Sequence, residues 1–253
     1  MLTTETTKAY LSILREELVP ATGCTEPIAL AYAAARLRDI LGVWPERIRA
    51  EVSGNIIKNV KSVVVPNTGG LKGISAAIAA GIAAGDAEKI LQVISTVPSD
   101  RHGAIAAYCQ DTLIEIVCAD TPRMLDIRLT GWAGEHSACV HIANSHSNIV
   151  REEKNGEVLL EKPVTDSAED SLTDKSVLNV ADILEFANTA ELGDIAPLLQ
   201  RQIDCNTAIA AEGLKNNWGA NIGSVLLVEY PGDIKTEAKA WAAAGSDARM
   251  SGC

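Results

Sequence analysis

Two cysteines stand in similar surroundings of glycine and small polar residues, near opposite ends of the chain. Cys24 lies in the run ATGCTEP (residues 21–27), and Cys253 ends the run GSDARMSGC (residues 245–253). A thiol just ahead of a helix faces unpaired backbone N–H groups and the positive end of the helix dipole, which stabilise its thiolate. Because thiolates bind soft metals, we expect these two cysteines to be metal ligands that folding brings together.

The spacing of the cysteines does not itself identify a metal site. The chain has no Cys-x-x-Cys pair, so the common zinc and iron–sulfur fingerprints are absent. On local evidence a buried, inert side chain is the commoner role for a single cysteine such as Cys24, and that alternative stays open. The other cysteines lie within or beside apolar segments, and we assign them to structure: Cys109, Cys118, Cys139 and Cys205.

Two further groups of residues could bind an anion. Thr68, Gly69 and Gly70 belong to a glycine-rich loop before an expected helix, where exposed N–H groups suit a carboxylate or phosphate. A tight turn that leads into a packed helix is an equally good interpretation. Asn55 and Lys58 are three residues apart, on one face of a helix, and could present an amide and an ammonium to a substrate carboxylate. A solvated surface pair is the alternative.

The histidines do not form a recognisable metal site. His136, His141 and His146 recur every five residues, an odd spacing that places neighbours on opposite faces of a strand. We therefore expect no metal site made from these three side chains.

Composition limits the classes of function. The chain has 253 residues, is 47% hydrophobic with 4% aromatics, and carries a net charge of −11, which argues against nucleic-acid binding. The N-terminus lacks the basic and apolar regions of a secretory signal, and the longest apolar stretch, 73–85, is too short to span a membrane. Six scattered cysteines without an export signal favour reduced thiols in the cytoplasm.

Hydrophobic periodicity predicts an α+β fold, in which an Ala/Gly-rich helical domain is interrupted by an antiparallel β-meander. We expect an N-terminal helical part at 1–112, a β insertion at 113–165 with an exit linker at 165–174, and a second helical part at 166–253. An Asn-Gly pair at 155–156 predicts a two-residue hairpin turn. A short helix or turn is expected at 55–59, and a second helix begins near Cys24 and has its apolar face at 30–41. Alanine and glycine in the 74–84 helix allow very close neighbours, so we expect that helix to be central. The other expected helices are 11–18, 177–187, 196–214, 222–229 and 235–244, and the expected strands are 47–53, 63–65, 125–130, 138–143 and 147–152.

Four motifs taken together resemble the L-cysteine desulfidase family, which is related to the α chain of iron–sulfur L-serine dehydratases. The resemblance covers essentially the whole chain and implies an oxygen-sensitive [4Fe–4S] cluster held by three cysteines, with one iron open to substrate. The implied reaction is α,β-elimination from L-cysteine, which gives hydrogen sulfide, pyruvate and ammonia without pyridoxal phosphate. The motifs are GCTEPIA (23–29), NIIKN (55–59), VPNTGG (65–70) and GSDARMSGC (245–253).

The resemblance also assigns ligands. Cys24 and Cys253 match two ligand positions, whereas members of the family continue past the second cysteine into a helical region that holds the third. The resemblance thus implies a chain truncated at its C-terminus, with the third ligand beyond residue 253 unless Cys205 or another thiol substitutes for it.

Other residues are assigned to the substrate, a small amino acid. Arg249 could hold its carboxylate bidentately, and Lys58 could remove the α-proton if desolvation lowered its pKa. Otherwise Lys58 would anchor the substrate with Asn55 and the 68–70 loop. An L-serine dehydratase-like ammonia-lyase, a non-catalytic fragment and an anion-binding module are the alternatives, and a homodimer stays open.

Overall fold

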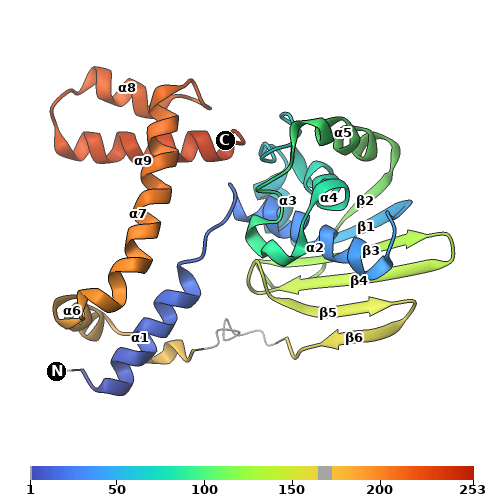
Figure 1. The fold of residues 1–253 in the computed structure, drawn as a ribbon, viewed down its shortest axis with the longest axis horizontal. Helices are drawn as coiled ribbons and strands as arrows, with labels where there is room; N and C mark the ends of the chain where they lie inside the picture. Colours follow the sequence, from blue (N-terminus) through green and yellow to red (C-terminus); the bar gives the residue numbers. More distant parts are fainter. Residues whose placement is uncertain (1, 165–172) are drawn as a thin grey trace.

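A six-stranded sheet organises one of the two lobes of the protein, described here from a computed structural model that places residues 2–164 and 173–253. The strand order is β2-β1-β3-β4-β5-β6, with β1 parallel to β2 and every other neighbouring pair antiparallel (Figure 1). The strands are β1 (Arg47–Val52), β2 (Leu113–Cys118), β3 (Asp126–Ala133), β4 (His136–Ala143), β5 (Ile149–Lys154) and β6 (Glu157–Glu161).

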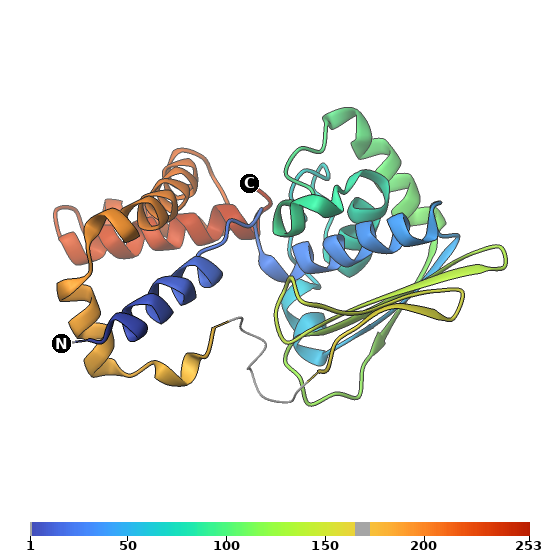
Figure 2. The ribbon, with the colours of Figure 1, turned by 60° about the horizontal axis from the view of Figure 1, so that its bottom comes forward.

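Helices cover one face of this sheet, with α2 (Thr25–Leu41) lying against β3 and β4 (Figure 2). Helix α4 (Gly73–Ala84) packs on α2 so closely that a Cβ added at Gly81 would lie 2.2 Å from the carbonyl oxygen of Ala31. This close packing needs the small residues of both helices, and it confirms the prediction that the 74–84 helix is central. Helices α3 (Gly54–Val60) and α5 (His102–Asp111) and the 3-10 turns Ala87–Gln92 and Ser99–Arg101 complete the lobe.

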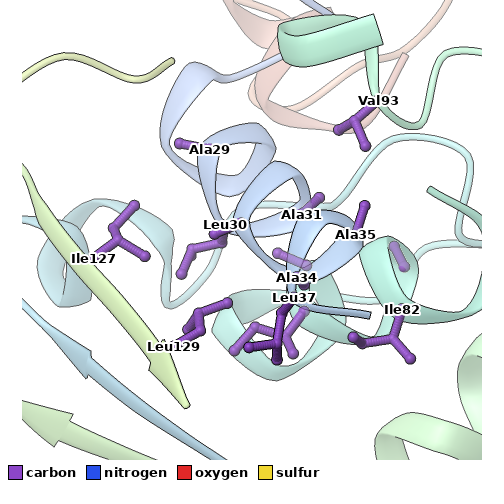
Figure 3. Close-up of a cluster of buried hydrophobic side chains, with 14 of the residues drawn as sticks. Ala29, Leu30, Ala31, Ala34, Ala35, Leu37, Ile82, Val93, Ile127 and Leu129 are labelled. Atoms are coloured by element: carbon purple, nitrogen blue, oxygen red, sulfur yellow. The ribbon is translucent and has the colours of Figure 1, made fainter. Parts of the chain in front are cut away.

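The core lies between α2, α4 and the sheet. Leu30 and Leu37 from α2, Ile82 from α4, and Ile127 and Leu129 from β3 are all fully buried there (Figure 3). Aliphatic side chains and alanines fill this layer, as the low aromatic content predicts.

The second lobe is a helical bundle made from both ends of the chain (Figure 1). Tyr10 packs edge-on against Phe186 at 5.4 Å, so the first helix belongs with the last four. A Cβ added at Gly213 would lie 2.1 Å from the carbonyl oxygen of Ala244, which shows how closely two of these helices approach. The helices are α1 (Thr4–Glu17), α6 (Val180–Thr189), α7 (Leu192–Lys215), α8 (Ile222–Glu229) and α9 (Ile234–Met250), with a 3-10 turn at Lys175–Val177.

The structure confirms the α+β class, the meander of β3 to β6, and the hairpin turn, where Asn155 and Gly156 both have positive φ. Two expectations were wrong. Residues 63–65 form only an isolated bridge, between Val64 and Lys72, because the segment turns at once into the glycine-rich loop. Strand β2 was missed, and its pairing parallel to β1 ties the meander to a strand from the N-terminal part. The predicted linker falls at 165–174, of which 165–172 lie outside the described residues.

None of the helices in the described part of the chain combines the length and apolar character that crossing a bilayer requires.

Candidate functional site

Segments from three parts of the sequence meet where the two lobes face each other. Gly23, with φ +79°, packs so closely on the ring of Pro66 that an added Cβ would lie 2.6 Å from it. Gly252, with φ +85°, packs in the same way on the side chain of Val64, at 2.5 Å. These glycines directly precede Cys24 and Cys253. Each cysteine therefore follows a residue that packs on one short segment, 64–66.

A cavity of about 450 Å³ opens beside this junction. Its walls come from the connection between α1 and α2, from the middle of α7 and from the end of α9. Cys253, Arg249 and Cys205 line it, together with Gly23 and Thr25, the two neighbours of Cys24. The cavity therefore brings together residues from the first and last motifs of the chain.

Cys24 is the N-cap residue of α2, as the sequence predicts, and its thiol donates a hydrogen bond to Glu26 Oε2 at 3.2 Å. Burial and the neighbouring Glu26 carboxylate together raise the pKa of Cys24 to about 11, while Arg249 acts in the opposite direction. The expectation of a stabilised thiolate is therefore wrong for this structure. Loss of hydration and a nearby negative charge outweigh the helix dipole.

Glu26 is the centre of a polar cluster at the start of α2. Its carboxylate accepts hydrogen bonds from Asn59 Nδ2 at 3.1 Å and from the Thr25 hydroxyl at 3.3 Å, besides the one from Cys24. Burial opposes ionisation of Glu26, but these hydrogen bonds outweigh it and lower the pKa of the carboxyl. Glu26 is thus a carboxylate held by donors from both α2 and α3.

His146 lies in the turn between β4 and β5 and interacts electrostatically with Glu26. Burial lowers the pKa of His146, although the negative charge of Glu26 partly offsets this effect. A neutral imidazole near an ionised carboxylate can accept and pass on a proton at neutral pH.

The other predicted residues lie in different settings. Arg249 lines the cavity and donates a hydrogen bond from Nη2 to Asn206 Oδ1 at 3.3 Å. Asn55 and Lys58 lie on α3 and do not line the cavity. Lys58 is exposed to solvent. The residue of α3 that reaches the cluster is Asn59, one position further along.

The glycine-rich loop is closed on itself. The buried hydroxyl of Thr68 donates to the carbonyl oxygen of Val65 at 2.7 Å and accepts from the backbone N–H of Leu71 at 3.1 Å. Gly69 and Gly70 take positive φ values, and Gly69 packs beside the ring of His102. These contacts fit the alternative interpretation of the loop as a tight turn, and none of the three residues lines the cavity.

Sequence reasoning missed Glu26, Asn59 and His146 as interacting groups. Glu26 and Asn59 stand inside quoted motifs but are 33 residues apart. His146 was weighed only as a member of a histidine series, and its partner comes from another element. Cys205, assigned to structure, is exposed and lines the cavity with Cys253.

The donors do not complete a three-cysteine cluster site. Within residues 2–164 and 173–253, no three His, Cys, Asp or Glu side chains are grouped closely enough to hold a metal ion. Cys24 and Cys253 would supply two of the three thiolates, and Cys205 is the remaining thiol at the cavity.

The chain is similar over nearly all its length to UPF0597 proteins. It is 52% identical over 246 residues to that of Desulfitobacterium hafniense, 47% over 251 to that of Lachnoclostridium phytofermentans and 44% over 250 to that of Treponema denticola. These matches cover 96–97% of this chain but only 57–59% of each relative. None of the three names states an activity. No family model matches the chain, and no solved structure matches it.

Proposed function

We propose that the chain carries part of the active site of an iron–sulfur-dependent lyase in the L-cysteine desulfidase family. The reaction is α,β-elimination on L-cysteine, which yields hydrogen sulfide, pyruvate and ammonia without pyridoxal phosphate. One observation carries the proposal: the glycines that precede Cys24 and Cys253 both pack on segment 64–66, beside a cavity that an arginine lines. The motif resemblance supplies the chemistry that such a junction could perform.

The two cysteines would supply two of the ligands of a [4Fe–4S] cluster. When bound, such a cluster supplies a Lewis-acidic iron. A third ligand must come from Cys205 or from polypeptide that the longer relatives carry and this chain does not match. Metal binding needs thiolates, and the raised pKa of Cys24 means that loading would release a proton there.

The side chains at the cavity can bind the rest of an amino acid. Arg249 is the cation near Cys24, and a guanidinium can hold an α-carboxylate through two parallel hydrogen bonds. The α-proton needs a base within hydrogen-bond reach. Lys58 remains the prediction from the sequence, and His146 is the competing candidate because burial favours its neutral form and it interacts with Glu26, although neither residue lines the cavity.

Anaerobic reconstitution with iron and sulfide tests the proposal, on this chain and, in parallel, on the intact Desulfitobacterium relative. We expect the intact relative to bind a brown cluster and to release sulfide from L-cysteine. Cys24→Ala and Cys253→Ala, and the matching changes in the relative, should lose the cluster absorption. Cys118→Ala, which changes an exposed cysteine at the sheet edge, is the matched control. A Cys24→Ala protein that keeps both cluster and activity would contradict the ligand assignment.

The alternatives make different predictions in the same assay. An L-serine dehydratase-like enzyme would release ammonia and pyruvate from L-serine faster than sulfide from L-cysteine. If this chain is a non-catalytic fragment, it would show neither cluster nor product while the intact relative showed both; an anion-binding module would show neither in either protein. We expect such an enzyme in the cytoplasm, because the cluster requires reduced thiols.

A further inference from the structure

The C-terminal part of the helical lobe, residues 173–253, buries mostly small apolar residues and exposes large ones. Over residues 173–253, the buried apolar side chains are Phe186 and four alanines, on α7 and α9. Thirteen large apolar side chains in the same region are exposed, on every helix from α6 to α9 and in the segments between them. Proteins that work as monomers rarely expose apolar surface on this scale, so part of this lobe has the character of an interface.

The middle of α7 is exposed to solvent on all sides. Every residue from 200 to 208 is exposed, although that stretch makes two and a half turns of helix. In Figure 1, the long helix α7 extends from α6 at one end to α8 and α9 at the other. A helix in a globular protein normally buries one face, whereas this stretch has only partial contacts, among them the hydrogen bonds between Arg201 and Leu18 and between Asn206 and Arg249.

An open groove of about 460 Å³ lies along this stretch, between α7 and α9. Ile203, 56% exposed, and Trp241, 40% exposed, line it, and Arg249 stands at the point where the groove meets the interlobe cavity. The groove therefore offers exposed apolar side chains to a partner and borders the candidate site.

We propose that this groove, lined by Ile203, Ile209 and Trp241, is the docking surface for a polypeptide equivalent to the part of the UPF0597 relatives that this chain does not match. The Desulfitobacterium relative matches 97% of this chain, and so nearly all of the helical lobe, over only 57% of its own length. It thus carries the same lobe together with a large further segment that has to pack somewhere. The exposed stretch of α7 and its groove are a part of the lobe that has only partial contacts. The proposal rests on this exposure and not on the proposed reaction.

The docked polypeptide has to be apolar where it meets the groove. It presents an apolar helical face to Ile203 and Trp241, and its edge lies beside Arg249 and closes one wall of the interlobe cavity. Docking would cover the nine exposed residues 200–208 of α7 and would bury part of the exposed apolar surface of the lobe.

Amide hydrogen exchange of two intact proteins tests the proposal without isolating any fragment. In this chain, peptides from 200–208 should exchange at least a hundredfold faster than peptides from α4, which is buried. In the intact Desulfitobacterium relative, the aligned peptides should be protected, with exchange slowed at least tenfold relative to this chain. Equal, fast exchange in both proteins would overturn the proposal. Protection already present in this chain and lost on dilution would assign the groove to a second copy and would also overturn it.

Co-expression provides a second test on this chain itself. The unmatched segment of the relative, co-expressed with this chain, should form a one-to-one complex measured by light scattering. Ile203→Asp and Trp241→Glu should reduce that complex at least tenfold, whereas Leu113→Asp, at an exposed apolar residue of the sheet edge, should leave it unchanged. A complex that survives both groove substitutions would contradict the location. Loss of cluster or activity plays no part in these outcomes, so they are independent of the proposed lyase.

Discussion

The thiol of Cys24 donates a hydrogen bond to the carboxylate of Glu26, two residues further along, with 3.2 Å between sulfur and Oε2. The other carboxylate oxygen accepts from Asn59 on α3, at 3.1 Å. The contact keeps the thiol protonated and orients it at the start of α2. A soft metal that binds here must replace that proton, and Glu26 then loses one donor. The four predictions below follow from this cluster and from the packing of the helices around it.

Replacing Glu26 by glutamine should make Cys24 more reactive. A Cys24 pKa of about 11 leaves on the order of a thousandth of the thiol ionised at pH 8, because each pH unit below the pKa is a factor of ten. Glu26→Gln removes the negative charge that raises this pKa, so the pKa should fall. We expect several-fold faster iodoacetamide labelling at pH 8, measured by peptide mass spectrometry. Cys118, exposed on β2, reports any general change in reactivity. Unchanged labelling of Cys24 would mean that burial alone sets its pKa.

Replacing Arg249 should have the opposite effect. The Arg249 guanidinium lowers the pKa of Cys24, and Arg249→Gln removes its positive charge. We expect slower labelling of Cys24 in the same assay, with the titration midpoint moved to higher pH. Arg201→Gln removes a second arginine of the same cavity and is the matched control. If both substitutions slow labelling equally, the effect reflects the net charge of the cavity and not the position of Arg249.

A second carboxylate beside Glu26 should destabilise the protein. Asn59→Asp replaces a donor by an acceptor at 3.1 Å, and we expect a loss of about 1–3 kcal/mol in the free energy of unfolding at pH 7. The two negative charges repel each other only while both groups are ionised. Their repulsion raises the pKa of one of the two groups, so the penalty should shrink as the pH falls towards about 4, where that group has taken a proton.

The matched control for this substitution is Asn55→Asp. Asn55 lies one turn earlier on α3, and its side chain makes no hydrogen bond within residues 2–164 and 173–253. We expect a change within about 0.5 kcal/mol by urea denaturation. If Asn55→Asp cost as much as Asn59→Asp, general sensitivity of α3 to negative charge would explain both results.

The helical lobe should be sensitive to one added methyl group. A Cβ at Gly213 would lie 2.1 Å from the Ala244 carbonyl oxygen, so Gly213→Ala must push α7 and α9 apart. We expect a loss of about 1–3 kcal/mol in the free energy of unfolding, measured by thermal or urea denaturation. Gly193→Ala, in the first turn of the same helix, meets no atom within 4 Å. It should be neutral or stabilise the protein by up to about 1 kcal/mol. If Gly193→Ala destabilised the protein, this control would not be reporting helix propensity alone.

Local features of the fold could be predicted from the sequence. The Asn155-Gly156 turn was predictable because two consecutive positive-φ residues leave few alternatives. The central position of α4 followed from its alanines and glycines, which permit close neighbours. Strand β2 was not predictable in the same way. It lies at the sheet edge, and the strand to which it pairs in parallel, β1, is more than sixty residues away.

The candidate site shows the same division. The position of Cys24 at the start of a helix was predictable, since Pro27 in the first turn marks where the helix begins. The protonation of Cys24 was not, because it depends on how deeply folding buries the thiol and on Glu26 turning back towards it. The interaction of Glu26 with His146 joins α2 to a turn of the sheet, and no local pattern encodes that distance.

The packing of α1 against α6, α7 and the turn before them sets the order in which this lobe can fold. The Tyr10 hydroxyl donates to the carbonyl oxygen of Val177 at 3.2 Å, across a separation of 167 residues. A ribosome delivers α1 first and its partners last, while the sheet lobe between them can already fold. During synthesis Tyr10 and Ile13 therefore stay exposed until the residues that bury them have been made. Closing so long a loop between α1 and its partners makes this lobe the late step of folding.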